Sequence, residues 1–145
     1  MIPRNSLFYK LWQLGLTRKL ISLLQNLYHS NVSQVVACLK NFLLIKELNS
    51  PLLFTLYLND LNDHLPGGIA IGETTIKVLK YADDIVLLAD SPSILQKMIN
   101  SLFSYCSIWA LKINLQKSKV LVFRKSGRLS ANLEWRYGDN PIEIV

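Results

Sequence analysis

Residues 75–90 read Thr-Ile-Lys-Val-Leu-Lys-Tyr-Ala-Asp-Asp-Ile-Val-Leu-Leu-Ala-Asp, so that apolar, β-prone runs at 76–79 and 85–88 flank Asp83 and Asp84. This pattern predicts a β-hairpin whose turn carries the two carboxylates. Both side chains can face one end of a sheet from a tight turn, where their oxygens suit divalent cations. The pair would then form half of a two-metal phosphoryl-transfer site. The alternative is structural, because Asp also stabilises turns by hydrogen-bonding its own backbone.

The flanks of the aspartate pair favour the chemical interpretation. Tyr81 and Ala82, followed by Asp83-Asp84-Ile-Val-Leu-Leu-Ala-Asp, resemble the catalytic motif of reverse transcriptases, in particular the non-LTR retrotransposon (LINE-like) and group II intron type. Residues 7–28, 50–61 and 111–123 are similar to parts of the same family's palm region, in the same order. The resemblance implies part of an RNA-directed DNA polymerase that uses an RNA template, a DNA primer and Mg²⁺ or Mn²⁺.

The resemblance also implies roles for single residues. Asp83 would bind metal directly and Asp84 would support the site, while Lys117, or next Lys119, would approach the nucleotide phosphates. An exposed lysine beside a strand is the alternative for either lysine. The family's third, bridging carboxylate comes from a strand that would precede Leu7, and we expect the chain to lack that strand.

Other aspartates are weaker candidates for a third ligand. Asp90 follows Asp84 by six residues, which places it roughly 20 Å along an extended strand. Asp60 and Asp63 lie three apart on an expected helix, where solvated helix-end carboxylates are the simpler interpretation.

Charge is concentrated in one segment. The chain has 16 basic and 10 acidic residues, and its net charge is +6. Residues 112–128 contain six basic side chains and no acidic one, so this segment carries the whole excess. A nucleic-acid-binding surface is predicted there, although a solvated face is an alternative. Besides the two lysines named above, its basic residues are Lys112, Arg124, Lys125 and Arg128.

Composition sets the class of protein. Half of the 145 residues are apolar and mean hydropathy is +0.24, so some apolar surface is expected to meet a neighbour. No apolar run approaches the ~18 residues of a membrane span, and residues 1–5 do not open a signal peptide. We therefore expect an intracellular chain, nuclear or cytoplasmic, with no membrane partner. Cys38 and Cys106 lie outside any CxxC spacing, so two reduced core thiols are expected.

Periodicity predicts a helical hairpin at the start of the chain. One helix spans residues 7–14, with Asn5 or Ser6 as its cap and Gly15 as its stop, and a second spans residues 17–28. Residues 31–49 diverge from the family pattern, since the glycine and glutamine expected before Ser50 are missing.

Cap signals place the remaining elements. Ser50 at the N-cap and Pro51 at N1 open a buried helix. Ser91 and Pro92 repeat that signal for a helix that reaches about Leu111. Residues 69–75 are expected to form a connection with some strand character. The later strands are expected at residues 120–123, 133–137 and 142–145, the last two as a terminal hairpin.

Together these elements predict an α+β fold. The expected architecture is a partial palm, a βαββαβ-like antiparallel sheet with helices on one face, lacking the first catalytic strand, the fingers and the thumb. We expect one domain over 1–145: a helical hairpin to residue 30, the divergent segment 31–49, a palm core over 50–125 and a hairpin over 126–145. Residues 31–39 or another chain would fill the place of the missing strand, or the chain would fold loosely. The alternative function is a non-catalytic remnant, a weak nucleic-acid-binding or hydrophobic interaction module.

Overall fold

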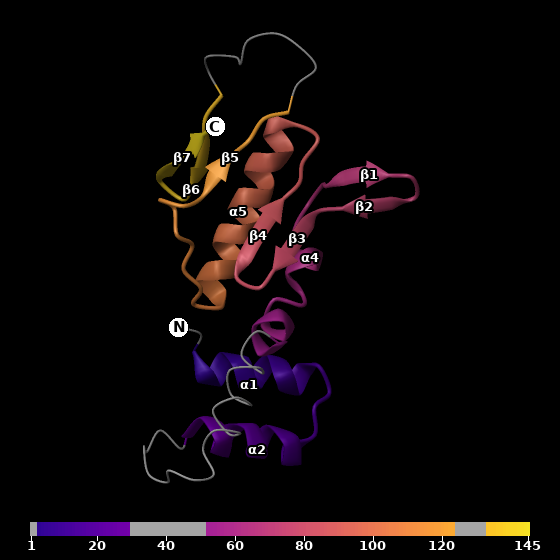
Figure 1. The fold of residues 1–145 in the computed structure, drawn as a ribbon, viewed down its shortest axis with the longest axis vertical. Helices are drawn as coiled ribbons and strands as arrows, with labels where there is room; N and C mark the ends of the chain where they lie inside the picture. Colours follow the sequence, from indigo (N-terminus) through magenta and orange to yellow (C-terminus); the bar gives the residue numbers. More distant parts are fainter. Residues whose placement is uncertain (1–2, 30–51, 124–132) are drawn as a thin grey trace. The chain divides into compact units, whose positions relative to one another are not determined.

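The computed structural model describes residues 3–29, 52–123 and 133–145, which mix helices with short strands (Figure 1). This mixture agrees with the expected α+β class. Contacts divide the chain into two compact units, one of residues 1–60 with 81–84 and the other of residues 61–80 with 85–145. The single-domain organisation stays a prediction. Several sequence-based expectations lie outside the described residues, namely those for residues 31–49, Cys38, Ser50, Pro51, Arg124, Lys125 and Arg128.

The first unit opens with the expected helical hairpin, α1 (Arg4–Gln13) and α2 (Arg18–His29). Gly15 ends α1 as predicted: its φ is +83°, and its N–H bonds the Trp12 carbonyl at 3.0 Å. The next N–H, that of Leu16, reaches back to the Leu11 carbonyl at 3.2 Å. These two bonds form a Schellman-type cap, which favours glycine because the left-handed conformation costs it least.

The predicted cap at the start of α1 is wrong. The helix begins at Arg4 after Pro3, whose carbonyl accepts a 3.1 Å hydrogen bond from the Leu7 N–H. Asn5 and Ser6 therefore lie inside the first turn. The Ser6 side chain hydrogen-bonds Tyr57, a partner distant in sequence, so it contributes to packing.

A helical segment at residues 52–57 contributes further buried side chains to the first unit. Its beginning lies outside the described residues. The apolar run predicted for this helix is buried in part, since Leu52 is 56% exposed. The buried side chains of this unit include Leu7, Leu11, Ile21, Leu53, Tyr57 and Leu58.

Two small hairpins follow the short helix α4 (Leu61–His64) in the chain. In the first, β1 (Ile69–Ile71) pairs antiparallel with β2 (Thr74–Ile76), and Gly72 in its turn has a φ of +60°. The connection with strand character expected here is thus a complete hairpin. In the second, β3 (Val78–Tyr81) pairs with β4 (Asp84–Leu87).

The long helix α5 (Pro92–Ile108) forms as its cap signal predicts, with Ser91 at the N-cap and Pro92 in the first turn. It ends three residues before Leu111, because Ala110 turns left-handed with a φ of +52° and the Leu111 N–H bonds the Cys106 carbonyl at 2.8 Å. Its buried face contains Met98, Ile99, Leu102, Tyr105 and Cys106. The burial of Cys106 as a free thiol was expected.

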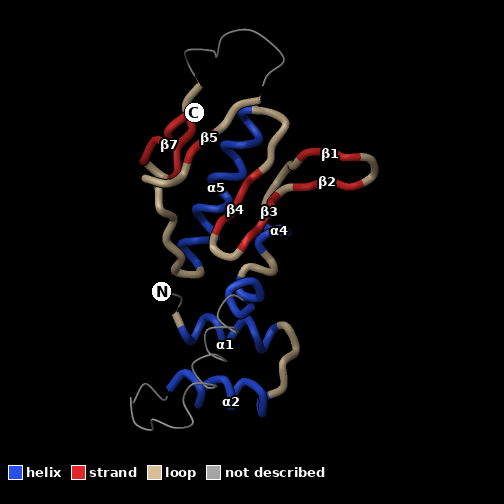
Figure 2. The backbone as a smooth tube through the Cα atoms, in the orientation of Figure 1, coloured by secondary structure: helices blue, strands red, loops and turns tan. Residues whose placement is uncertain are grey.

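A three-stranded sheet packs against α5 (Figures 1 and 2). Its strand order is β5 (Lys119–Val120), β7 (Asn140–Ile144), β6 (Trp135–Tyr137). The strands β6 and β7 confirm the terminal hairpin, whereas the strand expected at 120–123 is confined to two residues. The shared core centres on Ile99, Val120 and Trp135.

The central strand β7 contains Pro141, which lies outside the strand predicted at residues 142–145. Pro141 lies opposite Arg136 of β6, whereas β5 pairs only with Glu143 and Ile144. Pro141 therefore has no strand on its β5 side, and its missing N–H disturbs no ladder there.

The described strands form three separate small sheets. The pairing of β5 with β7 is parallel, so it differs from the expected antiparallel order. The α+β class is supported, and the single palm sheet is not seen within these residues. Among the described helices, none is both long enough and apolar enough to span a bilayer.

Candidate active site

The tip of the β3–β4 hairpin presents the motif aspartates. The two-residue turn is Ala82-Asp83, one residue earlier than the predicted Asp83-Asp84 turn, and Asp84 is the first residue of β4. Ala82 has a φ of +50°, a left-handed conformation that costs a non-glycine residue about 1 kcal/mol. The Leu88 N–H bonds the Lys77 carbonyl at 2.9 Å, so the ladder continues beyond both strands. The flanking strands therefore hold a strained turn.

Asp83 and Asp84 are both exposed, and neither forms an ion pair with the described part of the chain. The preceding Tyr81 is 83% exposed. The carboxylates are thus two unpaired, solvent-facing oxygen donors on adjacent residues. The described residues contain no group of three His, Cys, Asp or Glu side chains that could hold a metal. A third ligand to join this pair is absent from that part of the chain.

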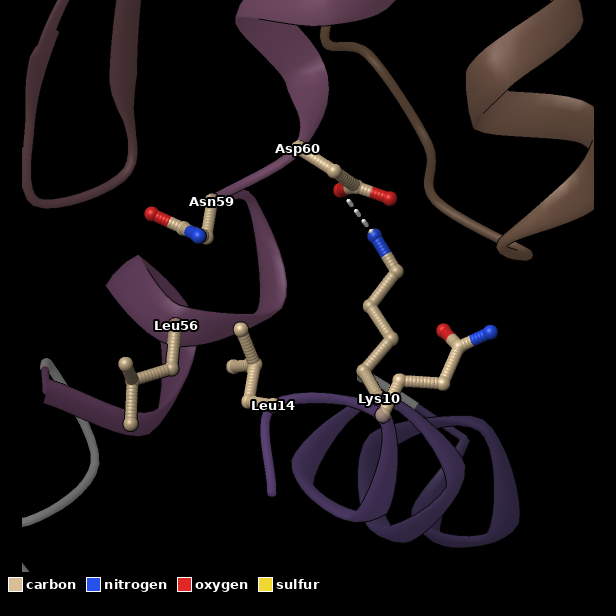
Figure 3. A pocket seen from close by; sticks show the side chains of 6 residues that line it. Lys10, Leu14, Leu56, Asn59 and Asp60 are labelled. Carbon is tan, nitrogen blue, oxygen red and sulfur yellow. Dashed lines mark hydrogen bonds and ion pairs between the residues drawn. The ribbon is translucent and has the colours of Figure 1, made fainter. Parts of the chain in front are cut away.

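Asp60 has a specific partner in place of the solvent expected from the sequence. Lys10 Nζ donates to Asp60 Oδ1 at 2.6 Å (Figure 3). The same nitrogen donates to the Tyr57 carbonyl at 2.6 Å. It also lies 4.9 Å from the centroid of the Tyr57 ring. The paired carboxylate is therefore a poor candidate for metal binding.

Sequence reasoning missed Lys10, which is a buried cation at 3% exposure. The sequence did contain a signal: Lys10 interrupts the apolar stripe formed by Leu7, Leu11 and Leu14 at helical spacing. A cation on such a stripe requires a buried partner.

A small hollow of about 120 Å³ lies beside the Lys10–Asp60 pair (Figure 3). Leu14 and Leu56 supply its apolar wall, and Gln13 and Asn59 supply amides. Its charged groups are already bonded to each other, so the hollow offers no unpaired charge to a ligand.

The expected phosphate-binding lysines differ in their surroundings. Lys119 forms an ion pair with Glu143, the residue directly opposite it in the β5–β7 register. Lys117 and Lys112 are exposed, and no described side chain forms an ion pair with either. The Lys117 N–H bonds the Asn114 carbonyl at 3.1 Å, which fixes the turn before β5.

Comparison with known proteins identifies the family. Residues 4–138 match the model of the reverse transcriptase (RNA-dependent DNA polymerase) family, and the chain therefore belongs to that family. It is also 49% identical over 43 residues to a Caenorhabditis elegans protein described as uncharacterized and transposon-derived. That match covers 30% of this chain and 15% of the relative. No solved structure matches the chain.

Proposed function

We propose that the chain carries part of the catalytic palm of an RNA-directed DNA polymerase of the non-LTR retrotransposon or group II intron type. The observation that supports this most directly is the β3–β4 turn, where Asp83 and Asp84 stand adjacent, exposed and unpaired within the described residues. Strained backbone conformations cluster at functional sites, where the surrounding structure holds them in place.

The two carboxylates fit a hard divalent cation. Mg²⁺ and Mn²⁺ prefer oxygen ligands, and Asp83 and Asp84 would supply two of them. When bound, such ions activate a hydroxyl nucleophile and neutralise the leaving phosphates in nucleotidyl transfer. Asp83 would be the direct ligand, and Asp84 the supporting one.

The basic side chains of residues 112–128 would bind the substrates. Lys117 and Lys119, on either side of Ser118 at the start of β5, would approach nucleotide phosphates. Lys112, Arg124, Lys125 and Arg128 would attract the backbones of template and primer, because lysine and arginine neutralise phosphates without reading sequence. Further ligands and strands of the palm would come from other residues or from another chain.

Manganese binding tests the aspartate site. Mn²⁺ broadens nuclear magnetic resonance signals near it, so residues 81–85 should lose intensity first. We expect Asp83→Asn to weaken this binding by about tenfold. Asp139→Asn is the matched control, since Asp139 is a single exposed carboxylate in the turn of the β6–β7 hairpin.

Two outcomes would contradict the proposal. Equal losses in Asp83→Asn and Asp139→Asn would show only diffuse attraction, and no broadening at residues 81–85 would exclude a metal site there. Salt-dependent binding of single-stranded oligonucleotides without manganese binding would favour the non-catalytic, nucleic-acid-binding alternative.

A further inference from the structure

We propose that the Glu143 carboxylate competes with phosphate groups for the Lys119 ammonium. Glu143 would thereby determine which phosphates bind at the lysine-bearing edge, the start of β5 with Lys117 and Lys119. This inference rests on the proposed phosphate-binding role of that edge. In the register of β5 with β7, Lys119 and Glu143 lie directly opposite each other and form an ion pair. The acidic partner is 24 residues away in sequence, so only the parallel pairing of β5 with β7 joins the two charges.

The pair lies on the solvent face of the sheet. The next residues along the two strands, Val120 and Ile144, pack into the core against α5. Because side chains alternate across a sheet, Lys119 and Glu143 point the other way. Their side chains are 38% and 66% exposed, so a ligand from solvent can reach both.

Among the described residues, the same face carries one other ion pair, between Arg136 of β6 and Glu134, which directly precedes the strand. Arg136 Nη2 lies 2.8 Å from Glu134 Oε1, and both side chains are more than half exposed. Among the described residues of this sheet face, the charges therefore cancel pairwise. Lys117, two residues before Lys119, is exposed and adds a positive charge to the β5 end.

Competition follows from this arrangement. A phosphate oxygen and a carboxylate oxygen are both acceptors for the same ammonium donors. A phosphate group that binds Lys119 therefore competes with Glu143 for these donors and lies close to its negative charge. The cost of separating Lys119 from Glu143 is the same for every phosphate ligand, whereas the repulsion from the Glu143 carboxylate grows with the negative charge of the ligand. Glu143 should therefore weaken binding of a polyphosphate more than binding of a phosphodiester.

Inorganic tripolyphosphate, titrated calorimetrically at low salt, is the first probe. We expect Glu143→Gln to bind it about threefold more tightly than the unmodified chain does. Adding Lys119→Gln should remove that gain. Glu134→Gln is the matched control, since it deletes the same charge from the neighbouring pair on the same face, and it should change affinity less than Glu143→Gln. Equal gains in the two variants would show a general charge effect and overturn the proposal, as would no binding by any variant.

A single-stranded oligonucleotide is the second probe and separates the two sources of phosphate. We expect its affinity to rise by about twofold in Glu143→Gln, less than that of tripolyphosphate, because one phosphodiester carries less charge near Lys119. If the unmodified chain binds the oligonucleotide and Glu143→Gln changes nothing, the competition is refuted while the proposed function stands. If tripolyphosphate responds as expected and no variant binds the oligonucleotide, the competition holds and nucleic-acid binding fails.

Discussion

The ammonium of Lys10 lies 2.6 Å from the Asp60 carboxylate and thereby ties α1 to the turn that follows residues 52–57. The lysine side chain is 4% exposed and the aspartate side chain 36%. Removing the acid would leave the buried cation without this counter-ion. Such a change is costly because the charge has lost both water and its counter-ion.

Asp60→Ala should therefore lower the free energy of unfolding by about 2 kcal/mol. Lys10→Met should cost less, because the half-exposed carboxylate that remains can be hydrated. Urea unfolding followed by circular dichroism measures both. The control is Asp63→Ala, an exposed carboxylate in α4, which should change stability by less than about 0.5 kcal/mol. Equal effects of Asp60→Ala and Asp63→Ala would show that the buried pair does not stabilise the fold.

Gln96 of α5 protects the free edge of β6. Its amide donates to the Arg136 carbonyl at 2.8 Å and accepts from the Arg136 N–H at 2.9 Å, as a neighbouring strand would. Gln96→Glu keeps the shape and the acceptor but loses the donor, so the carboxylate would face the carbonyl. We expect a loss of about 1 kcal/mol in Gln96→Glu, measured by urea unfolding. Lys97→Gln, an exposed neighbour, should have no measurable effect, and a similar loss there would contradict the argument.

The sequence predicted the elements whose signals are local. The Gly15 stop, the Ser91-Pro92 start of α5 and the terminal hairpin all follow from residues adjacent in the chain. The contacts that it missed join distant residues: Lys10 with Asp60, Gln96 with Arg136, and Lys119 with Glu143. No local pattern specifies such partners, because the pairing depends on how the elements pack.

In the candidate site, too, the sequence predicted some features correctly and missed others. The identity of Asp83 and Asp84 as a motif came from adjacent residues, whereas the turn position differed by one residue because Ala82 adopts a left-handed conformation. Glycine is the residue that turn propensity favours at a position with positive φ. Alanine at position 82 therefore gave no turn signal, and the sequence predicted the turn at Asp83-Asp84 instead of Ala82-Asp83.

A glycine at position 82 tests the strain in that turn. Ala82→Gly should raise the free energy of unfolding by about 0.5 to 1 kcal/mol, since glycine adopts a φ of +50° without a Cβ clash. Ala110→Gly should behave alike, because the φ of Ala110 is +52°. Ala89→Gly is the control and should destabilise, since Ala89 does not have a positive φ. Thermal unfolding of the three variants makes the comparison, and destabilisation by Ala82→Gly would show that the turn is unstrained.

Stability should also fall at alkaline pH. Burial raises the pKa of the Cys106 thiol and of the Tyr137 phenol, and a hydrogen bond joins the two side chains. Both stay protonated in the folded chain, whereas the unfolded chain releases these protons near their ordinary pKa values of 9.0 and 10.0. The unfolded state then binds fewer protons, so stability is complete below pH 9.0 and declines above it.

Urea unfolding between about pH 8 and pH 11 should show this decline, with a slope of up to about 1.4 kcal/mol per pH unit for each proton. Tyr137→Phe should reduce the slope. An identical pH profile in the unmodified chain and in Tyr137→Phe would rule out this linkage.

Primer extension tests whether the described site is sufficient for catalysis. Two cations that bridge a hydroxyl and a triphosphate need carboxylates from more than one strand. The described residues offer Asp83 and Asp84 from one hairpin, while the Asp60 carboxylate is bonded to Lys10. We therefore expect the 145-residue chain to extend no primer on an RNA template, in either magnesium or manganese. An active polymerase of the same family would serve as the positive control. Template-dependent extension that Asp83→Ala abolishes would instead mean that a further carboxylate of this chain completes the site.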